Sequence, residues 1–151
     1  RIIGVGHEYR GDDAAGLHAA RMLRALNLEG VQVLESAGDA GHLIDLWQDP
    51  APAIVIDAMH SGAAPGAVCR LEPGAQPLPT GYFPSHSTHS LGVAESLELA
   101  RALKVMPGLL IVYGIEGKSY EPGAELSPEV AGALGEVVER IIKDLRNLRG
   151  G

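Results

Sequence analysis

The sequence of 151 residues has a single cysteine, Cys69, and few basic side chains. One cysteine excludes a disulfide within the chain and a cysteine-rich metal site, so we expect a reduced, cytoplasmic environment. Lys and Arg number 12 against 19 Asp and Glu, which gives a net charge of −7. Proteins that bind nucleic acid need a basic face to neutralise phosphates, and no cluster of Lys or Arg precedes the C-terminal helix. We therefore expect no nucleic-acid partner.

Long apolar runs are also lacking. None approaches the roughly 18–20 residues that a membrane span requires, and no charged segment followed by an apolar stretch indicates secretion. We expect neither a membrane segment nor export. Hydrophobic residues make up 46% and charged residues 21%, which is close to the average for soluble proteins. The length suits a single domain, residues 1–151.

Short apolar runs alternate along the chain with amphipathic segments. The run Ala53-Ile54-Val55-Ile56, for example, is typical of a strand buried on both faces of a parallel sheet. The pattern predicts strands at residues 2–5, 31–34, 53–56, 66–71 and 109–113, helices at 13–26, 41–47, 91–103 and 127–150, and a surface loop at 73–88. Such alternation predicts the α/β class, with helices on both faces of a mostly parallel sheet in a three-layer αβα sandwich.

The last helix has the clearest local signals. Ser127 can cap it, Pro128 suits its first position, and Glu129 favours the positive end of its dipole. Apolar residues then recur every three or four positions and form one stripe. We expect this stripe to pack against the sheet.

Ligands of open parallel sheets bind outside the carboxyl ends of the strands, so polar residues at those ends are candidates for chemistry. Asp12 and Asp13 follow the first strand, where helix capping accounts for one of them. Asp57 is predicted to end the third strand, and His89 to lie at the start of the helix at 91–103. Two carboxylates and an imidazole suit a divalent transition metal, and three ligands leave positions open for water or substrate. The alternatives, a turn-capping Asp and a solvated His, remain open at this stage.

Other familiar active-site patterns are absent. The sequence G-x-G-x-x-G of dinucleotide-binding folds would need Gly at position 9, where Tyr9 stands, and no phosphate-binding loop of the type G-x-x-x-x-G-K-[ST] occurs. Neither H-E-x-x-H nor G-x-S-x-G is present. Cys69 lies within a predicted strand, which favours a buried structural thiol over a nucleophile.

Several motifs in their order along the chain resemble those of the nickel-iron hydrogenase maturation endopeptidases. The motifs are Gly4-Val5-Gly6 with Asp12-Asp13 and Gly16, Ile56-Asp57-Ala58, Ser87-Thr88-His89-Ser90-Leu91-Gly92, Tyr113-Gly114-Ile115-Glu116 and Leu126-Ser127-Pro128-Glu129-Val130. Each motif alone is weak, but their order and spacing are fairly specific. The resemblance extends from Ile2 to about Leu148.

The resemblance implies a phosphorylase/hydrolase-like αβα sandwich. It also implies an aspartyl-type endopeptidase that removes a C-terminal extension from the precursor of a hydrogenase large subunit after nickel insertion. Asp13, Asp57 and His89 fall on the family's metal-binding and catalytic positions. Their metal would be nickel supplied by the substrate, with no organic cofactor. The partner would be the precursor, and the oligomeric state stays open.

Departures from the family pattern leave other readings open. His7 stands where the family usually has Asn, and Glu35-Ser36-Ala37-Gly38 replaces a usual Gly-Gly-Thr stretch. His7 and His86 are therefore possible additional ligands. A nickel carrier or chaperone without proteolytic activity would keep the same three residues. Peptidyl-tRNA hydrolase also begins with a strand and Gly-x-Gly, but its RNA substrate disagrees with the negative charge of this chain.

Overall fold

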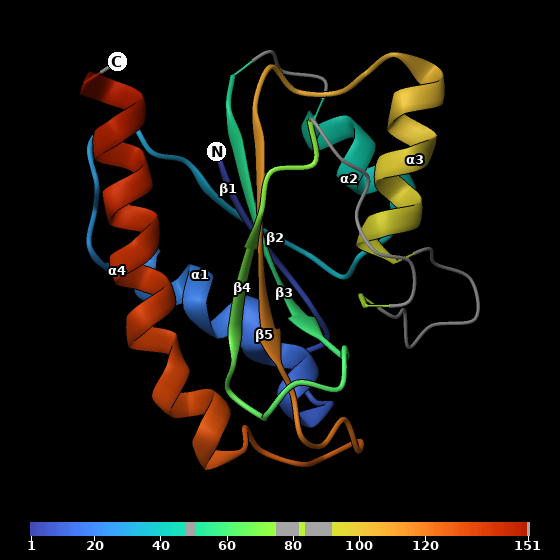
Figure 1. The fold of residues 1–151 in the computed structure, drawn as a ribbon, viewed down its shortest axis with the longest axis vertical. Helices are drawn as coiled ribbons and strands as arrows, with labels where there is room; N and C mark the ends of the chain where they lie inside the picture. Colours follow the sequence, from blue (N-terminus) through green and yellow to red (C-terminus); the bar gives the residue numbers. More distant parts are fainter. Residues whose placement is uncertain (48–50, 75–81, 84–91, 151) are drawn as a thin grey trace.

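The computed structural model describes residues 1–47, 51–74, 82–83 and 92–150 (Figure 1). The elements in chain order are β1 (Ile2–Val5), the 3-10 helix η1 (Gly11–Ala14), α1 (Ala15–Ala25), β2 (Val33–Ser36), α2 (Ala40–Trp47), β3 (Ala53–Met59), β4 (Val68–Leu71), α3 (Val93–Leu103), β5 (Leu110–Glu116) and α4 (Pro128–Gly150). No helix among these residues is long and apolar enough to cross a membrane.

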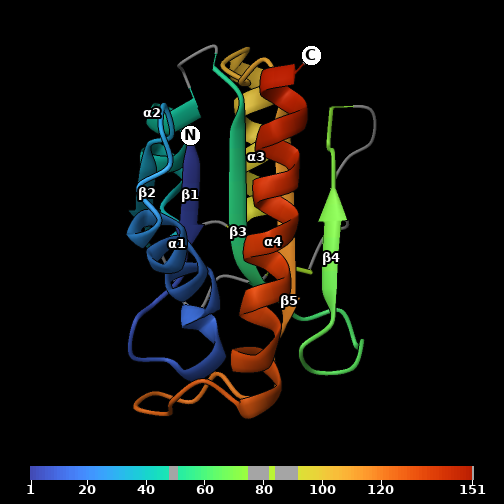
Figure 2. The same ribbon diagram turned by 90° about the vertical axis from the view of Figure 1, so that its left-hand side faces the viewer.

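The strands form one sheet in the order β2-β1-β3-β5-β4. The pairs β1–β2, β1–β3 and β3–β5 are parallel, and only the edge pair β4–β5 is antiparallel. Figure 2 shows β4 at one edge of the sheet and β2 at the other. The predicted mostly parallel α/β architecture is confirmed.

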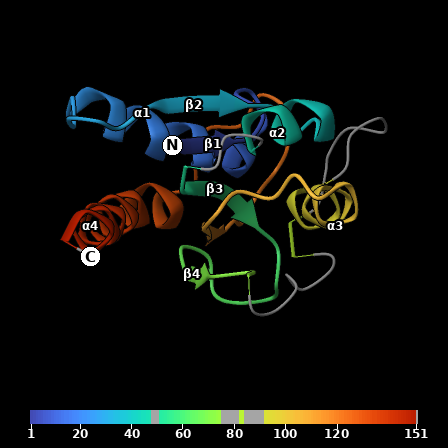
Figure 3. The ribbon, with the colours of Figure 1, turned by 90° about the horizontal axis from the view of Figure 1, so that it is seen from above.

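Helices cover both faces of this sheet, which gives the three layers seen from above in Figure 3. Side chains of successive strand residues point to opposite faces, so each buried strand supplies two cores. Ile54 and Ile56 pack with α1 and α4 in one core. Val55 and Met59 pack with α2 and α3 in the other. This explains why the strands read as continuous apolar runs.

The central strands extend further toward their carboxyl ends than the sequence indicated. Strand β3 runs to Met59 and β5 to Glu116, because their backbones stay paired through the register Met59↔Glu116. The prediction that Asp57 ends its strand was therefore wrong: it lies within β3, opposite Gly114. Strand β2 is also displaced, to residues 33–36, by its pairing with β1.

Helix α4 begins at Pro128, as predicted, and Ser127 directly precedes it. Its carbonyl oxygen accepts from the backbone N–H of Ala131 at 2.9 Å, as expected of the residue before a helix. Its hydroxyl, however, donates to Asp12 at 2.7 Å. The start of α4 is thus tied to the segment that follows β1.

A polar cluster fastens the same helix to the edge of the sheet. Asp144 of α4 accepts a hydrogen bond from the hydroxyl of Tyr113 in β5. It also accepts two from the guanidinium of Arg70 in β4, at 3.2 and 3.0 Å. Arg140 lies over the Tyr113 ring, 5.6 Å from its centroid. These contacts hold β4, β5 and α4 together.

Candidate functional site

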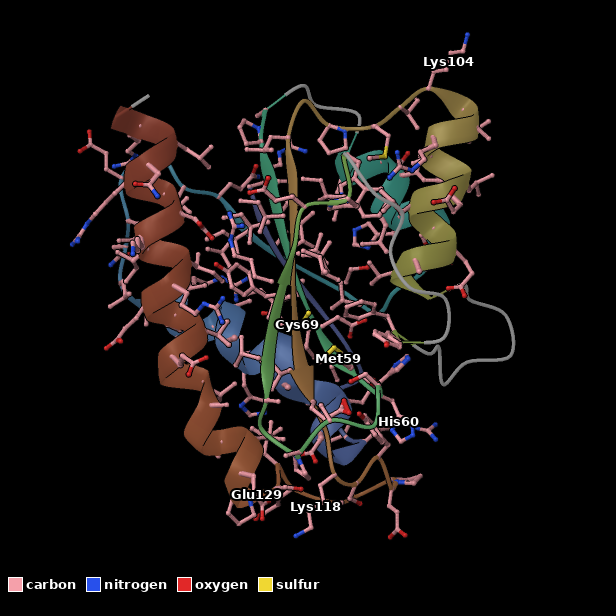
Figure 4. All side chains as sticks on the ribbon, viewed as in Figure 1. Met59, His60, Cys69, Lys104, Lys118 and Glu129 are labelled. Atoms are coloured by element: carbon pink, nitrogen blue, oxygen red, sulfur yellow. The ribbon has the colours of Figure 1, made fainter. Side chains whose placement is uncertain are left out.

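The strand order reverses at the carboxyl ends of β1 and β3, and we refer to this position as the crevice. From β1 the chain first adds β2 on one side and then returns to add β3 on the other, so the order reverses at the β1–β3 pair. Ligands of open α/β sheets bind at such a reversal, outside the carboxyl ends of the strands. Figure 4 shows Met59, His60 and Lys118 near this end of the molecule, and Lys104 at the opposite end.

Glycines allow η1 and the start of α1 to lie directly on these strand ends. A Cβ on Gly16 would stand 2.2 Å from the carbonyl oxygen of Ile56 and 2.5 Å from that of Val5. A Cβ on Gly6 would stand 2.0 Å from the carbonyl oxygen of Asp13. Any side chain at these positions would push η1 away from the sheet. The glycines therefore position Asp13 over the crevice.

The neighbouring Asp12 has a structural role. Its buried carboxylate accepts four hydrogen bonds: from the backbone N–H groups of Lys118, Ser119 and Ser127 at 2.7, 3.0 and 2.7 Å, and from the Ser127 hydroxyl at 2.7 Å. Burial acts to raise the pKa of Asp12, but these hydrogen bonds outweigh it and hold the pKa below its usual value. Asp12 thus anchors the loop between β5 and α4, a task that neither its sequence position nor helix capping indicated.

Asp13 and Asp57 form a pair of buried carboxylates at the crevice. Asp13 is 5% and Asp57 6% exposed. One oxygen of Asp13 accepts from the backbone N–H of His7 at 3.1 Å, and one of Asp57 accepts from that of Ala58 at 2.8 Å. Burial, and then the charge of Asp13, raise the pKa of Asp57 well above its usual value. The predicted convergence of Asp13, Asp57 and His89 stays a prediction, because His89 lies outside the described residues.

This pair is chemically suited to a cation. Two anionic groups placed close together out of water repel each other, and a positive ion between them would relieve both the repulsion and the lost hydration. Carboxylate oxygens are ligands for divalent metals. Within the described residues, no set of three or more His, Cys, Asp or Glu side chains gathers as a metal site. The two carboxylates by themselves are therefore an incomplete ligand set.

Glu116, to which sequence reasoning gave no role, supports the loop next to Asp57. It is 2% exposed at the end of β5, and it accepts from the backbone N–H of Ser61 at 2.9 and 3.0 Å and from the Ser61 hydroxyl at 3.2 Å. Tyr120 donates from its hydroxyl to the carbonyl oxygen of Met59 at 2.6 Å. Together they fix the path of the chain as it leaves β3. The one available signal was an acidic residue directly after a buried apolar strand.

Comparison with known proteins shows which family this chain belongs to. The model of the family described as "Hydrogenase maturation protease" matches residues 18–144. The chain belongs to the hydrogenase maturation protease family. The match includes Asp57 and the segment that carries His89, and it begins after Asp13.

Individual members of the hydrogenase maturation protease family resemble the chain over most of its length. Hydrogenase expression/formation protein HupD of Thiocapsa roseopersicina is 25% identical over 147 residues, which are 95% of this chain but only 66% of HupD. Hydrogenase 2 maturation protease of Escherichia coli (strain K12) is 26% identical over 148 residues, 96% of this chain and 89% of that protein. The structure of the [NiFe] hydrogenase maturation protease HybD from Thermococcus kodakarensis is 28% identical with a TM-score of 0.68, covering 94% of this chain and 95% of that one.

The histidines of this hydrogenase maturation protease family member lie in different settings. His89 and His86 are outside the described residues, so their predicted places at the site stay predictions; helix α3 is described from Val93. His7 contributes its backbone N–H to Asp13. His60 is exposed beside β3, with its ring 5.9 Å from that of Tyr120. The backbone of His7 thus contacts the carboxylate pair directly.

Cys69, the single cysteine, lies away from the crevice. It is in β4, half-buried against the core that α2 and α3 cover, and opposite Gly114 of β5. Its side chain packs with hydrophobic residues, which agrees with the predicted structural role.

Proposed function

We propose that the chain is an endopeptidase that removes the C-terminal extension from the precursor of a nickel-iron hydrogenase large subunit once nickel has been inserted. In this proposal Asp13, Asp57 and His89 contact nickel that the precursor carries. The precursor is thus both substrate and source of the metal. Processing takes place in the cytoplasm and uses no organic cofactor.

The observation that carries this proposal is the buried pair Asp13 and Asp57 at the reversal of strand order. Membership of the hydrogenase maturation protease family supports the substrate class. The pair supports the metal gate, because two desolvated carboxylates are costly to hold together until a cation arrives. An incomplete set of protein ligands fits a metal that brings its own ligands with it.

In the proposed reaction, shared nickel fixes the precursor so that its scissile peptide lies at the carboxyl edge of the sheet. The oxygen of a water molecule bonds to the carbonyl carbon of that peptide, and the carbon–nitrogen bond then breaks. A carboxylate of the pair takes the proton from the water and the leaving amine receives it. No covalent enzyme intermediate forms, in keeping with the lack of a G-x-S-x-G nucleophile motif.

A processing assay with purified precursor tests this proposal. Precursor with and without nickel is incubated with the wild-type chain and with Asp57→Ala, and shortening is followed by intact mass. We expect shortening only of nickel-loaded precursor and a loss of at least about a hundredfold in rate for the variant, since it removes one of the metal contacts. Wild-type rates for Asp57→Ala would overturn the site. Nickel binding without any cleavage would instead favour a carrier or chaperone.

A further inference from the structure

A groove lies beside the carboxylate pair, on the other side of η1. Its volume is about 470 Å³, within the usual range of ligand pockets. It is lined by Glu8, Tyr9, Gly11, Ala14, His18 of α1 and residues 123–126. We call it the carboxyl-edge groove. Gly11 and Ala14 of η1 line it, whereas Asp13 of the same short helix belongs to the pair. An occupant would therefore contact the same short helix that carries Asp13.

Backbone hydrogen bonds join the two walls of this groove. The N–H of Gly123 donates to the carbonyl oxygen of Tyr9 at 2.6 Å, and that of Gly11 donates to Ala124 at 3.1 Å. Asp12 adds its four bonds to the same loop. The groove is therefore preformed, and a ligand would not have to order it first.

The surface of the groove combines an aromatic side chain with unpaired negative charge. Tyr9 is 76% exposed, the highest value among the large hydrophobic side chains of the described residues. Exposed Glu125 lines the groove and Glu121 precedes it in the loop; neither forms an ion pair with another described residue. Glu8, which also lines the groove, is paired with Arg21 at 3.1 Å, and Lys118 of the same loop as Glu125 is paired with Glu129 at 3.3 Å. Tyrosine is enriched at protein interfaces, and uncompensated carboxylates attract cations.

We propose that the carboxyl-edge groove binds a cationic segment of the precursor, with an Arg or Lys stem along Tyr9 and its charge facing Glu125. This inference rests on the proposed function, because it names a docking contact for the same substrate. A second copy of the chain fits less well, since each copy has a net charge of −7 and would be repelled from a negative groove. The contact acts on binding and leaves the hydrolytic step unchanged.

Charge reversal at Glu125 tests the docking contact, with Glu29→Lys as the matched control. Both residues are exposed and both changes raise the net charge equally. Glu29, however, precedes β2 and so lies toward the amino ends of the parallel strands, whereas the groove lies beyond the carboxyl end of β1. Binding to nickel-loaded precursor is measured by surface plasmon resonance, and processing by KM and kcat. We expect Glu125→Lys to weaken binding and raise KM about fivefold to tenfold, with kcat unchanged. The effect should shrink in high salt, which screens exposed charges. Glu29→Lys should match wild type.

Tyr9→Ala supplies a second, uncharged test, since it leaves the backbone bond from Gly123 in place. It should weaken binding to a similar degree in low and high salt. Cleavage with normal KM in both groove variants would overturn the docking contact and leave the protease intact. Salt-dependent binding that needs Glu125, without cleavage by wild type, would support the groove and overturn proteolysis. No binding of the precursor by wild type would overturn both the docking contact and the proteolysis. Dimerisation of the chain through the groove would overturn the docking contact alone.

Discussion

The two adjacent aspartates give a sharp prediction, because Asp12 holds a loop in place through four hydrogen bonds, whereas our proposal gives Asp13 a contact to nickel. In Asp12→Asn the side chain keeps its shape but loses its charge, and one carboxylate oxygen becomes an amide that donates. The oxygen that remains can still accept from the N–H groups of Lys118 and Ser119 and from the Ser127 hydroxyl. The new amide group then faces the N–H of Ser127, so two donors face each other.

The cost follows from these four bonds. Hydrogen bonds to a charged acceptor contribute about 1.5–3 kcal/mol each and neutral ones about 0.5–1.5 kcal/mol, and a buried donor left unpaired costs about 1–3 kcal/mol. Because the loop can relax, we expect Asp12→Asn to lower the free energy of unfolding by about 3 kcal/mol. For a chain of this length that corresponds to a fall of about 6–12 °C in Tm.

The pH dependence gives a second measure of the same contact. The folded pKa of Asp12 lies below its unfolded value, so its stabilising effect is present above the unfolded pKa and is lost as the pH falls through the folded one. The free energies of unfolding of wild type and Asp12→Asn are measured with denaturant at pH 7 and in acid. The difference between the two proteins should become smaller as the pH falls. Asp13→Asn is the control and should change stability little while lowering processing. Equal losses of stability in the two variants would refute the separation of roles.

Three further predictions concern the site and its support. Asp57→Asn should be more stable than wild type at neutral pH, and denaturant unfolding should show this gain shrinking in acid. The reason is that the pKa of Asp57 is higher in the folded than in the unfolded chain. Its contribution to stability is therefore present below the unfolded pKa and is lost as the pH rises through the folded pKa. Gly16→Ala should lower the free energy of unfolding by about 3 kcal/mol, measured by thermal unfolding, because the new Cβ overpacks against strand carbonyls. Gly132→Ala in α4 should raise the free energy of unfolding by about 0.5–1 kcal/mol, because its Cβ meets nothing within 4 Å. Tyr113→Phe should lower the free energy of unfolding by about 1–2 kcal/mol, because it removes the hydrogen bond to Asp144. Burial and the bond to Asp144 raise the pKa of the Tyr113 hydroxyl to about 12, so it stays a donor at ordinary pH. An unchanged Tm would refute this.

The fold could be predicted from sequence because its strands are buried on both faces. Continuous apolar runs such as Ile54–Ile56 identify central parallel strands, and Pro128 marks the start of α4. Strand ends were less predictable, since they depend on pairing between distant segments: the register Met59↔Glu116 extends both strands beyond their apolar runs. The antiparallel direction of β4 has no local signal at all.

The candidate site was predictable in its residue types and less so in its roles. Asp13 and Asp57 were predicted as site residues from their positions: Asp13 follows the first strand, and Asp57 lies near the carboxyl end of the third. The distinction between Asp12 and Asp13 was not accessible, because it depends on a loop more than 100 positions away that donates to one carboxylate. The support from Glu116 likewise requires the neighbouring strand.

The most direct test of the account observes the nickel itself. Nickel-edge X-ray absorption is recorded for nickel-loaded precursor alone, with the wild-type chain frozen before cleavage, and with Asp57→Ala. The account predicts that wild type adds oxygen or nitrogen neighbours to the nickel, at roughly 2.0–2.2 Å by analogy with first-row metals, and that the variant adds fewer. A nickel spectrum that is unchanged when the wild-type chain binds would contradict the claim that these carboxylates recognise the metal.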